Sequence, residues 1–463
     1  MQTLSLNRLP GATHTLSSNK RVVVKQRSLA KCYVQRKNSL KITASGFRNS
    51  PDSRPSHTVS KSIALDASVL TEEDVPETKK KIAMRIDNVW YDCTGWAKAH
   101  PGGARFVEYF NGRDATDAFY ALHSYGPNGS DVALKRLQKL PKCEAPEGAN
   151  LPEKVNAKTA AACEDFREFR VKLEEDGWFQ RNLLQEAKHI AQTVVPYILG
   201  TALAFSHPVA ATLLIGLGMQ QAGWLTHDFL HGRGKYCDTM ECLGPLLNGF
   251  NSHWWVQKHS MHHVFTNEHN KDEDITMEPI FYLEKPEKTG TPDSPARQWQ
   301  HVYGYPMYLV TYMLWRFDSL RTALKRRDTK ELAMMAVNYC WLACLPWQVA
   351  IGSIAVGGFL VGALVSATHQ SEEIMFEQGE FVDVQFRSTR DAEVKNPFAR
   401  YLWGGMDTQL EHHLFPTMPR YKYHKLRPIL QAFCEKSGFG YRISPDSKII
   451  SDNWNTLKEM AMP

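Results

Sequence analysis

The sequence predicts an α-helical integral membrane domain, with two transmembrane hairpins and about four crossings, preceded by a small soluble α+β domain. Two runs without any charged residue, 190–226 and 332–371, contain 37 and 40 residues. About 20 apolar residues cross one bilayer, so each run is long enough for two crossings. Uncharged runs of this length are difficult to explain as the core of a soluble protein.

The chain begins with a basic segment. Residues 1–50 contain ten Lys and Arg and no Asp or Glu. This composition is typical of an organelle transit peptide, and residues 42–45 (ITAS) resemble a chloroplast processing site. A basic arm that touches anionic lipid is the alternative. We therefore expect a chloroplast membrane, with the endoplasmic reticulum membrane as the alternative. Residues 51–76 are polar and are interpreted as a linker.

Charge and cysteine content exclude several classes of protein. The net charge is +6, and the basic segment supplies ten of the 55 Lys and Arg, which leaves 45 against 49 acidic residues. A basic surface for nucleic acid is therefore not expected. The nine cysteines include no CxxC pair, which argues against a disulfide framework or a thiolate zinc site. Four of them are expected to be packing residues in a reducing compartment: Cys237, Cys242, Cys340 and Cys344.

Residues 77–145 predict a compact soluble domain. Residues 82–92 alternate around an Asp-Asn pair, which indicates a strand hairpin. His100-Pro-Gly-Gly follows, and His123-Ser comes some two dozen residues later. With the preceding Tyr-Asp-Cys-Thr, these motifs resemble the cytochrome b5 haem-binding domain. The resemblance implies haem b with His100 and His123 as axial ligands. Iron held by two imidazoles has no open position for O2, so such a haem carries electrons.

Three further segments complete the predicted organisation. Residues 146–189 are charged and helix-prone, and they predict an amphipathic connector that leads to a membrane domain over residues 190–440. Residues 441–463 are interpreted as a C-terminal tail. The two charge-free runs are interrupted near their centres, by Ser-His-Pro208 and by Pro346 with Gly352. Because a hairpin returns the chain to the side it left, the soluble domain and all the histidine clusters are expected on one side.

The segment before the second charge-free run indicates which side this is. Its basic residues are Arg316, Arg321, Lys325, Arg326, Arg327 and Lys330. Their charge predicts the cytosol or its topological equivalent, the stroma. Residues 302–315 are uncharged but too few for a crossing, which favours a helix lying in the membrane interface. Four tryptophans are expected at the level of the lipid headgroups: Trp254, Trp255, Trp315 and Trp403.

Three histidine clusters have helical spacing. They are His227-x-x-x-His231, His259-x-x-His262-His263 and Gln409-x-x-His412-His413. Residues three and four apart share one helix face. Two or three such faces turned inward would form a nitrogen-rich cage for iron, copper or zinc.

Several other residues near the clusters are compatible with two roles. His369 closes the second charge-free run and is either a structural histidine or an additional ligand. Four carboxylates follow the second cluster: Glu268, Asp272, Glu273 and Asp274. They either orient the imidazoles as hydrogen-bond partners or belong to a solvated charged loop. The remaining histidines considered lack ligand spacing and are expected to be structural or surface residues: His253, His269, His301 and His424.

Residues 150–430 resemble the membrane-bound fatty acid desaturases through their HxxxH, HxxHH and QxxHH boxes. The haem domain, and Gln409 where most relatives have histidine, resemble the front-end subgroup of plastidial algal type. The resemblance implies two non-haem Fe, and it includes Gln409 among the catalytic residues. The implied ligands are His227, His231, His259, His262, His263, His412 and His413. His369 matches an extra ligand position, although Val365 replaces the Asn found there in related enzymes.

The resemblance implies an O2-dependent oxidoreductase that acts on the acyl chain of a membrane glycerolipid. Unactivated C–H bonds have no acidic proton, whereas iron with O2 and electrons can break them. The expected product has a new cis double bond between an existing one and the carboxyl end, at Δ4, or at Δ6 or Δ5. A reductase of the cytochrome b5 reductase or ferredoxin type would supply electrons. The alternatives are a sphingolipid long-chain-base desaturase, a fatty acyl hydroxylase, or a non-catalytic membrane protein that binds haem and metal.

Overall fold

The computed structural model describes residues 81–123, 132–150, 157–377 and 379–462. The predicted transit peptide (1–50) and linker (51–76) lie outside the described residues. Most of the described chain is helical.

The soluble domain begins with the predicted hairpin. Strands β1 (Ala83–Ile86) and β2 (Val89–Asp92) pair antiparallel, with Ile86 opposite Val89. Asp87 and Asn88 form the turn at φ of 49° and 62°. Asp and Asn tolerate this left-handed region, and two such residues match the twist of a tight hairpin. The helices that follow are η1 (Ala97–Ala99), α1 (Ala104–Tyr109), α2 (Thr116–Leu122) and α3 (Val132–Leu137).

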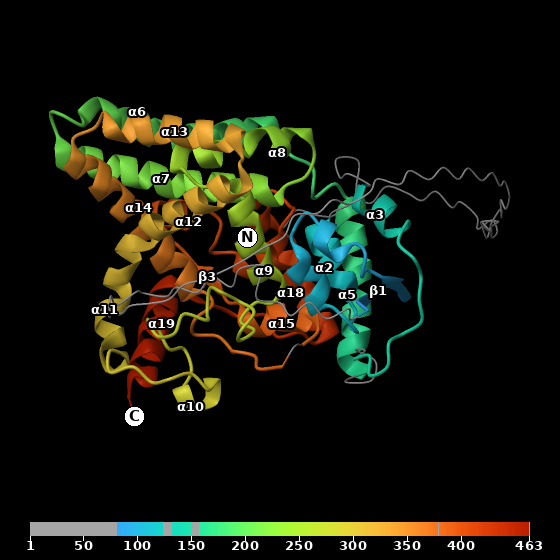
Figure 1. The fold of residues 1–463 in the computed structure, drawn as a ribbon. Coiled ribbons are helices and arrows are strands. Elements are labelled where there is room, and N and C mark those ends of the chain that lie inside the picture. Colours follow the sequence, from blue (N-terminus) through green and yellow to red (C-terminus); the bar gives the residue numbers. More distant parts are fainter. Residues whose placement is uncertain (1–80, 124–131, 151–156, 378, 463) are drawn as a thin grey trace, which may run out of the picture. The chain divides into compact units, whose positions relative to one another are not determined.

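Each charge-free run folds into two helices. The connector helix α5 (Ala157–Glu175) comes first. The first run forms α6 (Leu183–Leu203) and α7 (Pro208–His231), and the second forms α13 (Thr329–Ala343) and α14 (Trp347–Ala367). The four helices lie side by side in the upper left of Figure 1.

The predicted breaks in the two runs have different outcomes. The interruption before Pro208 is confirmed, and so is the one at Pro346, which caps α14. The prediction of a break at Gly352 is wrong, because this residue lies inside α14. One glycine costs a helix only about 1 kcal/mol.

Glycines allow the long helices to approach closely. A Cβ added at Gly216 of α7 would lie 2.6 Å from Cβ of Val356 in α14. A Cβ added at Gly200 of α6 would lie 2.6 Å from Cγ1 of Ile215 in α7. Small residues at these positions let helix backbones pack without steric overlap.

Among the described helices, one is long and apolar enough to cross a membrane on its own, Trp347–Ala367. Helix α13 has only 15 residues, and α6 begins with polar residues that include Glu186 and Lys188. The two transmembrane hairpins and the four crossings therefore stay a prediction.

The remaining elements are shorter, apart from α12, α18 and α19. In the middle of the chain they are α8 (Lys235–Met240), η2 (Gly244–Asn248), α9 (Ser252–Val264), α10 (Pro286–Thr289), η3 (Arg297–Trp299), α11 (Gln300–Met307), η4 (Tyr308–Val310) and α12 (Thr311–Arg326). Toward the C-terminus they are α15 (Phe381–Ser388), β3 (Asp391–Glu393), α16 (Pro397–Trp403), α17 (Gln409–Leu414), η5 (Arg420–Lys422), α18 (Tyr423–Ser437), β4 (Ile443–Pro445) and α19 (Asp446–Ala461).

The segment interpreted as a C-terminal tail is folded. Its strand β4 pairs in parallel with β3, and α19 packs against α11 and η3. The segment expected to lie in the membrane interface consists of α11, η4 and the start of α12 rather than one continuous helix.

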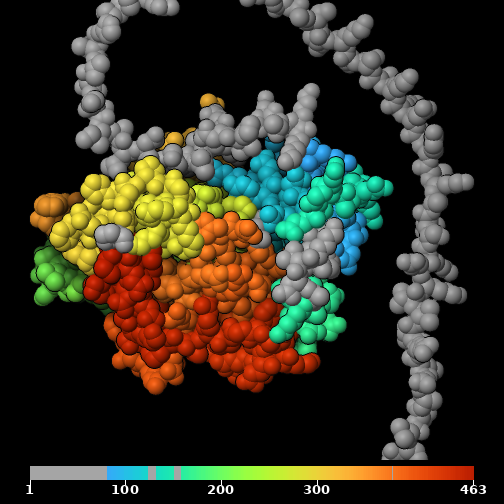
Figure 2. Space-filling view, turned by 90° about the horizontal axis from the view of Figure 1, so that it is seen from below, coloured from blue at the N-terminus to red at the C-terminus, as the bar shows by residue number. Residues whose placement is uncertain are grey.

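One apolar core joins the soluble domain to the rest of the chain. Phe265, just after α9, contacts the rings of Tyr109 and Phe110 in the soluble domain. Phe166 of α5 stacks on Phe415 after α17, with the ring centroids 5.5 Å apart. Figure 2 shows the soluble domain in blue and cyan beside segments in yellow and orange.

Four expectations for single residues are wrong. Trp403 is only 2% exposed and packs in the core instead of at a lipid headgroup. Arg316 is 5% exposed, with its guanidinium over the rings of Phe250 and Tyr312, so it does not belong to a basic surface. Cys340 in α13 and Cys344 just after it are exposed, so they are not packing residues.

Candidate metal centre and haem site

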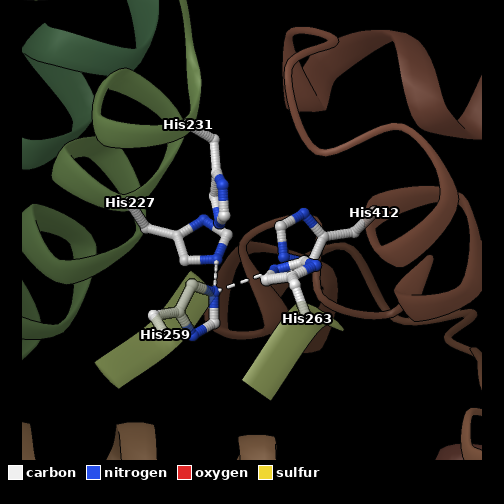
Figure 3. A group of neighbouring side chains, drawn as sticks. All are labelled: His227, His231, His259, His263 and His412. Carbon is white, nitrogen blue, oxygen red and sulfur yellow. Dashed lines mark hydrogen bonds between the residues drawn. The ribbon is translucent and has the colours of Figure 1, made fainter. Parts of the chain in front are cut away.

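Three helices bring the histidine clusters together (Figure 3). The last two turns of α7 carry His227 and His231, α9 carries the second cluster, and α17 carries the third. Side chains fix where two of these helices begin. Asn251 Oδ1 accepts a hydrogen bond from the Trp254 amide at the start of α9, and Asp391 Oδ1 accepts one from the Leu410 amide in α17.

Five histidines form the first group. Their facing nitrogens lie within 4.8 Å of one another, and they are His227, His231, His259, His263 and His412. His259 Nε2 lies 3.0 Å from His227 Nε2 and 3.1 Å from His263 Nε2. Nε2 of both His231 and His412 is buried and has no hydrogen-bond partner among the described residues. Buried polar atoms without partners are costly, and convergent imidazole nitrogens fit a metal such as iron.

Three histidines form a second group beside the first. They are His262, His369 and His413. Gln409 joins them, with its Nε2 2.7 Å from His369 Nε2 and 3.3 Å from His413 Nε2. Its Oε1 is buried without a partner among the described residues. Amide oxygen and nitrogen are assigned from such contacts, and exchanging them would direct the carbonyl oxygen at the two imidazoles. His369 and Gln409 therefore both lie at this group.

Polar residues behind the second group orient its rings. Asp272 Oδ2 lies 2.9 Å from His262 Nδ1, and Gln385 Oε1 lies 2.9 Å from His413 Nδ1. The Ser388 carbonyl lies 3.1 Å from His369 Nδ1. Partners on Nδ1 fix the ring orientation and leave Nε2 for a metal. Gln385 and Ser388 were not predicted from the sequence, because no motif spacing connects them to the histidines.

The carboxylates after the second cluster divide between the two roles considered for them. Asp272 is fully buried against His262, and Asp274 lies 3.8 Å from the same Nδ1. Glu268 pairs with Lys271. Glu273 pairs with Arg105, and its side chain is 47% exposed. Only the two aspartates therefore lie against a clustered imidazole.

Burial keeps most of these imidazoles neutral. It lowers the pKa of His259, His263, His412 and His413 well below the usual value, and neighbouring imidazoles add to the effect. Burial likewise lowers the pKa of His369 to about 3. Burial alone would also lower the pKa of His262, but the negative charge of Asp272 raises it overall. A neutral imidazole carries the lone pair that metal binding requires.

A carboxylate inside the first cluster, Asp228, ties α7 to η5, which follows the third cluster. Asp228 Oδ2 accepts a hydrogen bond from Arg181 at 2.9 Å, and Asp228 Oδ1 accepts one from the backbone amide of Arg420 at 3.0 Å. Trp255 packs its ring against His259, with the centroids 4.2 Å apart. These contacts fix the ends of α7 and α9 around the histidines.

The histidines expected to be structural lie outside both groups. His269 stacks on Phe376, and His424 lies 3.3 Å from a carboxylate oxygen of Asp407. His253 and His301 are also outside the two groups.

The soluble domain brings the rings of His100 and His123 together, with their planes inclined at 70°. Their ring centroids are 6.2 Å apart. His100 Nδ1 donates to the Gly103 carbonyl at 3.2 Å, and His123 Nδ1 donates to the Phe119 carbonyl at 3.0 Å. Both Nε2 atoms therefore remain for a ligand. Two metal–nitrogen bonds of about 2 Å, together with the distance from each Nε2 to its own ring centroid, add up to this centroid separation. One metal ion would therefore fit between the two rings. Burial lowers the pKa of both, that of His123 to about 3.

Two groups of buried imidazoles beside a two-histidine haem site define a metal-dependent redox protein. The family profile "Fatty acid desaturase" matches residues 204–445. The profile "Cytochrome b5-like Heme/Steroid binding domain" matches residues 70–142. The chain belongs to the fatty acid desaturase family, and a cytochrome b5-like domain is fused to its N-terminal side. It is an oxidoreductase of the kind that uses haem and a di-iron centre.

Curated relatives align with most of the chain. The acyl-lipid (9-3)-desaturase of Physcomitrium patens is 27% identical over 97% of this chain and 89% of its own length. The Delta(6)-fatty-acid desaturase fat-3 of Caenorhabditis elegans is 28% identical over 84% of this chain and 98% of its own length. The Delta(5) fatty acid desaturase fat-4 of the same organism is 28% identical over 78% and 91%.

Proposed function

We propose that this protein is a front-end acyl-lipid desaturase, which inserts a cis double bond between an existing double bond and the carboxyl end. The observation that carries the proposal is the arrangement of the histidines in two adjacent groups, with Gln409 completing the second. The relatives named as Delta(6) and Delta(5) desaturases support the front-end class. The position we favour is Δ4, with Δ6 and Δ5 as the alternatives.

In the proposal, the first group of five histidines holds one iron and the second group, with Gln409, holds the other. The convergent imidazoles of each group suit an iron ion. When bound, iron supplies the O2 chemistry that removes hydrogen from an unactivated C–H bond. The chain's own residues bury the imidazoles, fix the orientation of His262 and His413 through Asp272 and Gln385, and pack Trp255 against His259. Overall, the acyl chain loses two hydrogens, and O2 with two electrons and two protons becomes two molecules of water.

We also propose that α6, α7, α13 and α14 are four membrane crossings arranged as two hairpins. Large apolar side chains on these helices, and on the turn between α6 and α7, are exposed: Ile198, Phe205, Val209, Leu213, Val337, Trp347 and Ile351. Contact with lipid would bury them, whereas water would not. Helix α7 has 24 residues and is therefore about 36 Å long, enough for a bilayer core of about 30 Å. Its histidine-bearing end would then lie at the membrane surface.

The proposed setting is a plastid membrane, with the endoplasmic reticulum as the alternative. The basic, acid-free composition of residues 1–50 supports it. The proposed substrate is a polyunsaturated acyl chain of a glycerolipid, and the proposed electron donor is a reductase of the cytochrome b5 reductase or ferredoxin type. A fluorescent fusion, with and without residues 1–50, tests the location. We expect plastid fluorescence only with the full chain, and reticular fluorescence from it would contradict the plastid assignment.

Product analysis tests the reaction. Yeast cells expressing the chain are fed defined polyunsaturated fatty acids, and the new double bond is located by mass spectrometry. We expect a double bond on the carboxyl side of the existing ones, in glycerolipids, and none in cells that express His259→Ala. A hydroxylated acyl chain, or a modified sphingoid base, would replace the proposal with one of those reactions. Purified protein that holds zinc and forms no product would indicate a non-catalytic protein.

A further inference from the structure

Arg233 links helices α2 and α7 through hydrogen bonds. Helix α2 ends just before His123, one of the two haem histidines, and α7 ends in the first histidine cluster. Its Nε donates to the carbonyl of Leu122 at 3.0 Å, and its Nη2 donates to the same oxygen. Its Nη1 donates to the carbonyls of His231 at 2.8 Å and Gly232 at 3.0 Å. Leu122 ends α2 and precedes His123, and His231 ends α7.

The chemistry of the guanidinium suits this position. The last carbonyls of a helix have no partner within it, and they give the carboxyl end a partial negative charge. Here two such ends meet at one cation. Arginine presents five donors in a rigid fork, so a single side chain can bond to both ends at once. Within the described chain, the hydrogen bonds of the Arg233 guanidinium go to backbone carbonyls, those of Leu122, Leu230, His231 and Gly232.

The second haem histidine also lies on a segment that contacts the metal centre. A Cβ added at Gly103, in the loop after His100, would lie 2.9 Å from Nε2 of Gln257 in α9. Gln257 precedes His259 by two residues, just as Arg233 follows His231 by two. Both haem-ligand segments therefore rest on residues next to a histidine cluster.

We propose that Arg233 is a positioning residue that holds the haem domain against the histidine clusters in the orientation used for electron delivery. The inference rests on the proposed function. A haem held by His100 and His123 would deliver one electron at a time. Two such transfers, with the reductase as the source, supply the two electrons that one double bond requires.

The test compares Arg233→Gln and Arg233→Lys with the wild type in the full chain. Lysine keeps the charge, but its compact ammonium cannot bond to both helix ends as the planar fork does. Lys235→Gln is the matched control, because it removes an exposed positive charge two residues away. One readout is amide hydrogen exchange over residues 116–123, measured on protein without iron. The other is the rate of haem reoxidation after the reduced protein meets O2 and substrate.

In Arg233→Gln we expect faster amide exchange over residues 116–123 and haem reoxidation that is at least about tenfold slower, because a charge-assisted bond between two helix ends is lost. Arg233→Lys should show an intermediate effect on both readouts. The haem spectrum and its reduction by the reductase should not change. Wild-type exchange and reoxidation in both variants would overturn the inference. Loss of both iron and haem in both variants would also overturn it, because the role would then be general folding. If the desaturase proposal itself is wrong, the wild type will show no substrate-dependent reoxidation at all.

Discussion

The haem site and the metal centre both use imidazoles whose Nδ1 is held in place, but they collect them from different distances along the chain. His100 and His123 are held by carbonyls three and four residues away in sequence. In the metal centre, His262 is held by Asp272 from the next loop, and His413 by Gln385 from a different helix. The haem site is therefore a local construction, whereas the metal centre exists only after four distant segments have packed together.

The largest effect should come from removing a central imidazole of the metal centre. In His259→Ala, the first group loses the imidazole whose Nε2 lies 3.0 Å from Nε2 of His227 and 3.1 Å from Nε2 of His263. We expect desaturation to fall below detection, and non-haem iron to fall below the wild-type content, while the haem spectrum stays unchanged. Metal analysis together with the absorbance spectrum measures both sites. Loss of haem as well would show that the two sites do not fold independently.

The reciprocal experiment breaks the local site. His123→Ala removes one of the two axial positions, so we expect the six-coordinate haem spectrum to disappear. Non-haem iron should stay at the wild-type level, because no residue of the metal centre is altered. Reductase-driven desaturation should be abolished. Normal turnover in this variant would mean that electrons reach the metal centre by another route.

A smaller effect is expected from the residues that orient the metal-centre rings. Asp272→Asn keeps an oxygen acceptor beside His262 but removes the charge. Outer partners of this kind are worth about 10- to 100-fold in metal affinity, so competition with a chelator should show a loss in this range. Glu273→Gln, an exposed change on the same loop, should behave as the wild type. Equal losses in the two variants would indicate a general charge effect.

The smallest effect concerns the contact between the two regions. Burial, with Asp114 and Asp117 nearby, raises the pKa of Glu380 to about 7 in the folded protein, from an ordinary value of 4.5. Arg167 and Arg85 offset this only in part. A carboxyl group whose pKa is higher in the folded than in the unfolded protein favours folding most at pH values below its unfolded pKa. This stability is lost as the pH rises through its folded pKa.

The unfolding temperature of the wild type should therefore fall between about pH 4.5 and about pH 7, and this fall should be weaker in Glu380→Gln. Thermal unfolding across this range measures it, with the exposed Glu377→Gln on the same segment as control. An identical pH dependence in wild type and Glu380→Gln would contradict the assignment.

Short-range spacing determined much of this protein. The His-Pro-Gly-Gly turn, the Asp-Asn hairpin and the helical spacing of the three clusters all follow from the local preferences of a few neighbouring residues. The breaks at Pro208 and Pro346 follow from the backbone of proline. These patterns were sufficient to predict the soluble domain, the helix pairs and most of the clustered histidines.

Only the tertiary structure decided how these parts combine. It divides the histidines into groups of five and three, and it places His369 and Gln409 at the smaller one. It also buries Arg316 and Trp403, and it puts Gln385 and Arg233 beside the sites. The physical reason is distance along the chain. Helical periodicity relates residues within a few turns, whereas contacts between α7, α9, α14 and α17 depend on how whole helices pack.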